Sequence, residues 1–192
     1  MDLTQAGAGR KAYTFREPIG PVVAISAFNH PLNLIAHQVG PAVASGCPVL
    51  VKPAKDTPLS CKSFVEILYE AGLNENWCRF VPCSDEVAEK MVTDPRTAFF
   101  SFIGSARVGW MLRSKLAPGT RLALEHGGAA PVIVDDSVAH AKVIPPLLKG
   151  GFYHSGQVCV SVQRVFVHRS VVRQVVDGLV ALTEQLRVGD PT

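Results

Sequence analysis

A cysteine in the second half of the chain has the local setting of a nucleophile. Cys159 follows a glycine-led turn and a polar amide in the stretch Gly156-Gln157-Val158-Cys159. A thiol is a useful nucleophile when it can ionise and be reached, and a turn favours both conditions. A lone cysteine is more often a buried structural residue, so the prediction depends on other residues. The remaining cysteines lack such a turn and are Cys47, Cys61, Cys78 and Cys83.

Polar residues or glycines close several apolar runs and could complete a site around this thiol. The side-chain amide of Asn29 is a neutral donor suited to a developing oxyanion. Glu125 ends an apolar run, where burial would favour the role of a general base. Lys52 could reach a ribose or a phosphate, and Gly104-Ser105 precedes a helix whose free amides attract phosphate. Each of these residues alone also fits an ordinary turn, cap or surface position.

The elements that must position these residues alternate between strand and helix over residues 20–125. Apolar runs predict strands at residues 21–28, 49–51, 79–81, 98–103 and 121–125. Helices are expected at residues 32–44, 60–72, 85–91 and 106–116, the third capped by Asp85. The alternation predicts an α/β fold, a parallel Rossmann-like sheet with helices on both faces. Ligands of such sheets bind beyond the carboxyl ends of the strands, where the polar residues named above lie.

The composition changes at His126-Gly127-Gly128, where we expect a hinge and the start of a second α/β catalytic domain. Strands are expected at residues 131–134 and 162–167, and an amphipathic helix at about 170–186. A helix capped by Asp135-Asp136-Ser137 should run to about residue 151. The predicted domains are an arm or linker (1–16), a partial dinucleotide-binding domain (17–126) and a partial catalytic domain with Cys159 (127–192).

The composition narrows the class of protein. Of the 192 residues, 47% are hydrophobic and 18% charged, so a buried core is expected. The net charge of +3 without a basic run argues against nucleic acid as a partner, and no apolar stretch is long enough for a membrane span. The polar N-terminus does not look like a signal peptide. Five cysteines without a CxxC pair suggest neither a disulfide framework nor a metal site, and favour a cytoplasmic setting.

Five motifs in this order resemble the aldehyde dehydrogenase superfamily. They are Phe28-Asn29-His30-Pro31-Leu32-Asn33, Val51-Lys52-Pro53-Ala54, Phe102-Ile103-Gly104-Ser105, Leu124-Glu125-His126-Gly127-Gly128 and Gly156-Gln157-Val158-Cys159. The Glu-x-Gly-Gly and Gly-Gln-x-Cys stretches are the most specific, and their glutamate and cysteine stand 34 residues apart. The resemblance runs from about Glu17 to the end of the chain.

The resemblance implies NAD(P)-dependent oxidation of a small-molecule aldehyde to a carboxylic acid. Cys159 would attack the aldehyde and form a thiohemiacetal, with Asn29 and the Cys159 backbone N–H holding the oxyanion. Hydride transfer to NAD or NADP would leave a thioester, which water activated by Glu125 would hydrolyse. Full-length relatives are expected to be homo-oligomers. The residues implied in cofactor binding are Ile25, Ser26, Phe28, Lys52, Ala54, Lys55, Gly104 and Ser105.

The chain also departs from the family pattern. Lys55 stands where members commonly carry a glutamate three residues after the ribose-binding lysine, and His126 replaces the usual leucine after the catalytic glutamate. Members are roughly two and a half times as long, so the chain resembles a central fragment, and little activity is expected of it in isolation.

Three alternatives remain open. The first is a catalytically inactive NAD-binding remnant of the same family. The second is a thiol hydrolase in which His154 serves as the base for Cys159. The third is a member that passes the acyl group to CoA, although Glu125 favours water as the acceptor.

Overall fold

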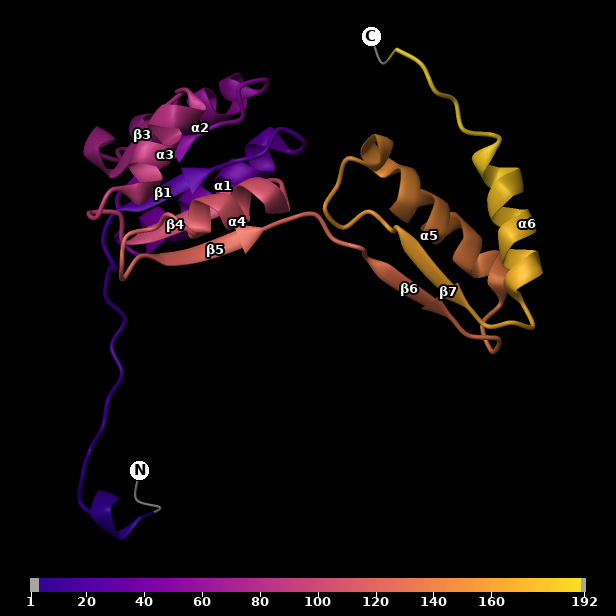
Figure 1. Cartoon of the computed structure of the whole chain (residues 1–192), viewed down its shortest axis with the longest axis horizontal. Helices are drawn as coiled ribbons and strands as arrows, with labels where there is room; N and C mark the ends of the chain where they lie inside the picture. The colour runs from indigo at the N-terminus through magenta and orange to yellow at the C-terminus, as the bar shows by residue number, and fades with distance from the viewer. Residues whose placement is uncertain (1–3, 191–192) are drawn as a thin grey trace. The chain divides into compact units, whose positions relative to one another are not determined.

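The computed structural model describes residues 4–190 and divides the chain into two compact units (Figure 1). The first unit contains the residues up to Ile103 together with Trp110–Leu124. The second contains Gly104–Gly109 and the residues from Glu125 onward. No helix among residues 4–190 combines the length and apolar character needed to cross a membrane.

The first unit is built on a parallel sheet with strand order β3-β2-β1-β4-β5. Its strands are β1 (Val22–Ile25), β2 (Val49–Lys52), β3 (Cys78–Phe80), β4 (Phe99–Ile103) and β5 (Arg121–Glu125). The expected α/β class and the parallel sheet are therefore confirmed. The first strand is shorter than the predicted 21–28. Its ladder ends where the Ser26 N–H donates to the Lys52 carbonyl at 3.0 Å, and the chain then bends toward the next helix.

Helices follow the strands as the alternation predicted. They are α1 (Pro31–Ala44), α2 (Pro58–Glu70), α3 (Asp85–Thr93) and α4 (Ala106–Arg113), with short 3₁₀ turns η1 (Gln5–Gly7) and η2 (Glu75–Trp77). The predicted cap of α3 was wrong by one residue. Ser84 is the cap, because its Oγ accepts the Val87 N–H at 3.4 Å, and Asp85 is the first helical residue. A hydroxyl at this position satisfies one of the free amides of the first turn.

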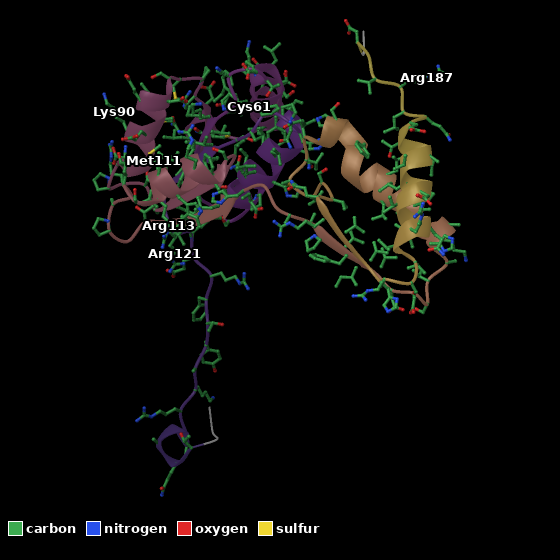
Figure 2. The ribbon with its side chains drawn as sticks, turned by 45° about the vertical axis from the view of Figure 1, so that its right-hand side comes forward. Cys61, Lys90, Met111, Arg113, Arg121 and Arg187 are labelled. Atoms are coloured by element: carbon green, nitrogen blue, oxygen red, sulfur yellow. The ribbon has the colours of Figure 1, made fainter. Side chains whose placement is uncertain are left out.

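Both faces of the central strands are buried. One face packs against α1 and α2 in a cluster that includes Ala24, Ile35, Val51, Cys61 and Cys78. On β1 and β4 the alternate residues form the opposite face, where Val23 pairs with Phe100 in the sheet register, and α3 contacts this side of β1. Figure 2 shows Cys61 inside this unit and Lys90 and Arg121 at its surface.

The second unit pairs two parallel strands, β6 (Pro131–Val134) and β7 (Arg164–Val167). Its helices are α5 (His140–Phe152) and α6 (Val172–Thr183), separated by the short turn η3 (Tyr153–Gly156) and β7. The two helices pack on one face of the strands around Val134, Leu147 and Val175. At Gly178 an added Cβ would lie 2.3 Å from Ile144 Cδ1, so this glycine allows α5 and α6 to approach each other closely.

Two boundaries in the second unit differ from the prediction. The Asp135-Asp136-Ser137 stretch does not cap α5, which begins at His140 after Ala139. Instead, Asp135 Oδ1 accepts the Ser137 N–H at 2.9 Å and closes a local turn. Strand β7 begins at Arg164 rather than at residue 162, because the Val162 N–H donates to the Gly150 carbonyl of α5.

Candidate active site

In the first unit, the sheet register brings together residues predicted to bind a cofactor. Ile25 at the end of β1 is paired with Lys52 at the end of β2. Beyond it, Ser26 is 5% exposed, and its hydroxyl has no hydrogen-bond partner among residues 4–190. Because a buried hydroxyl without a partner is costly, this edge of the sheet offers a polar group for a ligand. Ser26 and Lys52 thus lie at the carboxyl ends of β1 and β2, where ligands of parallel sheets bind.

Lys52 is held by a contact that the sequence did not predict. The side chain is largely buried, and its Nζ lies 3.5 Å from Oδ1 of the exposed Asp85 in the first turn of α3. Lys55, three residues further on, lies in an exposed turn between Ala54 and Thr57. The two lysines therefore have different surroundings, one paired and buried, the other open to solvent.

Gln38 is another residue that sequence reasoning missed. Its Nε2 donates to the Ile25 carbonyl at 3.2 Å and is 3.0 Å from Ser101 Oγ and 3.1 Å from the Ser101 carbonyl. The side chain is buried in α1 and ties the end of β1 to the middle of β4. A polar residue on the same buried stripe as Ile35 and Val39 was the available signal.

The remaining predicted residues of the first unit lie just after β1. Phe28 is 51% exposed, and Asn29 is half-buried in the bend that leads to Pro31, the first residue of α1. This bend belongs to the first unit, whereas Glu125 and Cys159 belong to the second.

Gly104-Ser105 precedes α4 as predicted. Ser105 Oγ accepts the Val108 N–H at 3.5 Å, and the Gly104 N–H donates to the Glu125 carbonyl at 3.0 Å. Glu125 itself is exposed, so the expected burial of this carboxylate was wrong. The reason is that β5 is an edge strand of the sheet, and Glu125 lies on the exposed half of its alternating side chains.

The two most specific motifs meet inside the second unit. An added Cβ on Gly128 would lie 3.2 Å from the backbone oxygen of Cys159. A side chain would therefore crowd this approach, and glycine keeps the Glu125 loop against the cysteine turn. The Ser161 N–H donates to the Val158 carbonyl at 2.9 Å, so Cys159 and Val160 form the centre of a tight turn.

The residues before this turn have unusual backbone angles. His154 and Ser155 both have φ of 54°, and Gly156 follows with φ of 73°. Left-handed backbone is costly for residues other than glycine, and such strain is concentrated at functional sites. The strained turn therefore makes this part of the chain a candidate functional site.

The five thiols differ in exposure. Cys159 is exposed, Cys83 is half-buried, and the other three are buried. Burial raises the pKa of Cys61 to about 12 and that of Cys78 to about 11, and the neighbouring Cys78 thiol also raises that of Cys61. Such thiols stay protonated near neutral pH and are poor nucleophiles. No cluster of three or more potential metal ligands occurs among residues 4–190.

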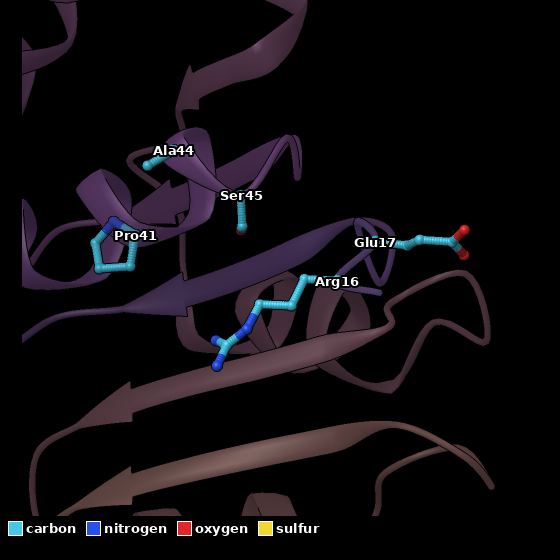
Figure 3. A pocket seen from close by; sticks show the side chains of 5 residues that line it. All are labelled: Arg16, Glu17, Pro41, Ala44 and Ser45. Carbon is cyan, nitrogen blue, oxygen red and sulfur yellow. The ribbon is translucent and has the colours of Figure 1, made fainter. Parts of the chain in front are cut away.

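A cavity of about 420 Å³ lies elsewhere in the first unit, between the end of α1 and the arm that precedes β1 (Figure 3). It is lined by Arg16, Glu17, Pro41, Ala44 and Ser45. Because α1 runs back from the carboxyl end of β1, its last turn lies near the amino ends of the strands. The side chains of Arg16 and Glu17 extend in opposite directions (Figure 3). This cavity is thus separate from the strand ends that carry the predicted cofactor residues.

Comparisons with known proteins agree on one family. The aldehyde dehydrogenase family matches residues 2–192. The 3-sulfolactaldehyde dehydrogenase of Priestia megaterium is 37% identical over the whole chain, which covers 40% of that protein. The chain therefore spans about 40% of the length of this curated relative.

Solved structures give the same picture. Aldehyde dehydrogenase 21 from Physcomitrella patens, in complex with the reaction product succinate, is 40% identical with a TM-score of 0.85, over 91% of this chain and 37% of that one. Glyceraldehyde-3-phosphate dehydrogenase from Methanocaldococcus jannaschii, complexed with NADP, is 34% identical with a TM-score of 0.86, over 92% and 40% of the two chains. Similar structures include complexes with NAD+ as well as NADP.

Proposed function

Because the chain belongs to the aldehyde dehydrogenase family, we propose that it supplies the thiol and the carboxylate for NAD(P)-dependent oxidation of an aldehyde to a carboxylic acid. The observation that carries the proposal is the close approach of Gly128 to the Cys159 backbone. It joins the Glu-x-Gly-Gly and Gly-Gln-x-Cys stretches in one unit. The exposure of both Cys159 and Glu125 supports access by substrate and water.

Cys159 acts first in the proposed mechanism. Its thiolate adds to the aldehyde carbonyl and forms a thiohemiacetal, and the resemblance to the family assigns the Cys159 N–H and the Asn29 amide as donors to the developing oxyanion. The nicotinamide cofactor, when bound, accepts the hydride that leaves the former aldehyde carbon. Loss of that hydride leaves a thioester on Cys159. Glu125 then takes a proton from water, which attacks the thioester and releases the acid and the thiol.

The cofactor is proposed to bind along the carboxyl ends of the strands. The buried Ser26 hydroxyl and the adjacent Lys52 supply polar groups at the end of β1 and β2. Gly104 and Ser105 lead into α4, whose first-turn amides suit a pyrophosphate, while the Gly104 N–H itself is bonded to the Glu125 carbonyl. Ile25, Phe28 and Ala54 would provide apolar surface, and Lys55 would lie near the adenosine ribose. The α/β topology supports this assignment, because ligands of such sheets bind at this edge.

Because little activity is expected of the chain in isolation, the test uses a full-length family member in which this chain replaces the matching segment, together with the Glu125→Gln variant of that protein. The protein with the unmodified chain should reduce NAD+ or NADP+ when an aldehyde is added, as followed by nicotinamide absorbance. The variant should give one burst of reduced nicotinamide and then stall, with an acyl group on the Cys159 peptide detectable by mass spectrometry. Cys159→Ala is the matched control and should give neither burst nor acylation.

Other outcomes would identify the alternatives. Steady turnover of Glu125→Gln at the unmodified rate would remove Glu125 from the mechanism. Cofactor binding without any turnover would indicate a non-catalytic remnant. Ester cleavage that needs no nicotinamide and is lost in a His154 variant would point to a thiol hydrolase instead.

A further inference from the structure

A second cavity, of about 290 Å³, lies beside the cysteine turn in the second unit. It is lined by Pro146, Lys149, Gly150, Tyr153, Val158 and Val160. The two valines are the chain neighbours of Cys159 on either side. The cavity is therefore next to the proposed nucleophile, although the proposed mechanism assigns it no role.

Hydrogen bonds hold the cysteine turn against the end of α5 and so form the cavity. Ser161 Oγ lies 3.3 Å from the Gly150 carbonyl and 3.1 Å from the Gly151 carbonyl, and Ser161 is only 6% exposed. The Val162 N–H also donates to the Gly150 carbonyl, at 2.9 Å. The Tyr153 N–H donates to the Lys149 carbonyl and places the ring beside the end of the helix. The walls are thus fixed by backbone contacts on both sides of Cys159.

Lys149 is the charged residue among those that line this cavity. No ion pair among residues 4–190 uses it, and α5 contains no aspartate or glutamate that could neutralise it. A lysine in the last turn of a helix is favoured by the helix dipole alone. The helix dipole does not explain why this lysine lies at an apolar cavity beside the proposed nucleophile.

We propose that this cavity receives the far end of the aldehyde and prefers a short substrate that carries an anionic group. The ammonium group of Lys149 would pair with a carboxylate, sulfonate or phosphonate, while Tyr153 and the two valines contact the carbons between that group and the carbonyl. A volume near the lower end of the usual range for ligand pockets favours a chain of only a few carbons. The inference rests on the proposed function, because it assumes that the aldehyde carbonyl reacts at Cys159.

The first test does not require dehydrogenase activity. Iodoacetate and iodoacetamide are nearly the same size and both alkylate a thiolate with loss of iodide, but iodoacetate is an anion. The alkylation rate at Cys159 is measured for each reagent by peptide mass spectrometry in the unmodified protein and in Lys149→Gln. The ratio of the iodoacetate rate to the iodoacetamide rate should fall by about two- to five-fold in Lys149→Gln, as for one exposed ion pair.

Two variants serve as controls for this ratio. Lys149→Arg keeps the charge and should keep the ratio close to that of the unmodified protein. Lys142→Gln removes the same charge from the same helix at a residue that does not line the cavity, and should also leave the ratio unchanged. An unchanged ratio in Lys149→Gln, or an equal fall in Lys142→Gln, would overturn the proposed anion preference.

The second test compares kcat/KM for aldehydes of matched length in the full-length family member that carries this chain. Succinic semialdehyde and its sulfonate and phosphonate analogues should react faster than butanal, and a trimethylammonium aldehyde should react slowest, with the spread reduced in Lys149→Gln. Oxidation that is fastest for the neutral or the cationic aldehyde would contradict the inference and leave the proposed function intact. A Lys149-dependent alkylation ratio without oxidation of any aldehyde would instead support the anion pocket and contradict the proposed function.

Discussion

In the first unit, β1 is buried along its whole length, whereas in the second unit β6 and β7 each bury only one face. The outer face of the smaller sheet exposes Ile133 at 82% and Phe166 at 57%. Residues at the ends of β1 and β2 are therefore positioned by the register of strands that are covered on both faces. Residues of the second unit are positioned by turns, close glycine contacts and the hydrogen bonds of Ser161.

The cysteines follow the same division. Cys61 and Cys78 are fully buried in the first unit, where they behave as small apolar side chains. Cys159 lies exposed in a turn of the second unit. Buried thiols of the first unit thus stabilise the structure, whereas the exposed thiol of the second unit is open to reactants. Substitutions in each unit can test this difference separately.

The largest expected effect is on chemistry. Cys159→Ala should lower aldehyde oxidation by at least about 10³-fold, because no covalent intermediate can form. Cys61→Ala should leave the turnover per folded molecule unchanged and cost about 1–2 kcal/mol of stability through the cavity it creates. Both are measured by steady-state assay and urea unfolding. If Cys61→Ala abolished oxidation in a folded protein, the division between the two thiols would be wrong.

The second prediction compares two phenylalanines. Phe100 is fully buried between strands and helices, so Phe100→Ala should lower the free energy of unfolding of the first unit by about 3–5 kcal/mol. Phe166→Ala removes a ring that is already more than half exposed and should change stability by less than about 1 kcal/mol. Both tryptophans, Trp77 and Trp110, lie in the first unit, so urea unfolding followed by their fluorescence reports on that unit, and unfolding of the second unit is followed by far-UV circular dichroism. Equal losses from the two substitutions would show that the outer face of β6 and β7 is covered.

The sequence was sufficient to predict the order of strands and helices in both units. Apolar runs closed by glycine or polar residues are local signals, and the strands found among residues 4–190 lie within or close to the predicted ranges. The predicted ends were less accurate at Ser84 and at Asp135, because a short polar side chain can cap a helix or close a turn and the difference depends on one hydrogen bond.

Contacts between distant segments could not be predicted in this way. The pairing of Lys52 with Asp85 and the bonds from Gln38 to Ile25 and Ser101 depend on how helices pack on the sheet. Similarly, the sequence suggested that Glu125 and Cys159 act together, but not that Gly128 would touch the Cys159 backbone. Spacing along the chain identifies such residues, and only the fold gives their neighbours.

The third prediction concerns stability at alkaline pH. Because burial raises the pKa of Cys61 to about 12 and of Cys78 to about 11, both thiols stay protonated in the folded state at pH 10, while they ionise in the unfolded chain above about pH 8.5. Their contribution is therefore fully present below pH 8.5 and is lost as the pH rises toward the folded-state values. Between pH 8.5 and 10 the loss should be about 2 kcal/mol per thiol, measured by urea unfolding.

The control for this prediction lies on the same helix. Cys61→Ala should reduce the fall in stability between pH 8.5 and 10, since one titrating group is removed. Val65→Ala, also in α2 and equally buried, should lower stability by the same amount at both pH values. An identical pH slope in the two variants would show that the Cys61 thiol is not protected from ionisation.

The smallest expected effect concerns Lys55, an exposed residue of the first unit. Lys55 lies in an open turn three residues after Lys52, which is paired with Asp85, so Lys55 is the lysine free to meet a further negative charge. If this turn faces the adenosine ribose, the lysine attracts a 2′-phosphate and a carboxylate would repel it. Lys55→Glu should therefore weaken NADP binding by several-fold, about 1 kcal/mol, and NAD binding less.

Titration calorimetry with each cofactor gives the dissociation constants of NADP and NAD, and the prediction concerns the ratio of the two. Lys90→Glu makes the same change of charge on the outward surface of α3 (Figure 2) and controls for the overall field of the protein. An NADP-to-NAD ratio that changes in Lys55→Glu but not in Lys90→Glu would place the turn beside the ribose. Equal weakening of both cofactors by Lys55→Glu would mean that Lys55 points away from the 2′-position. Cofactor choice would then depend on buried Lys52 and its exposed partner Asp85, and the exposed turn would contribute only to the general charge of the unit.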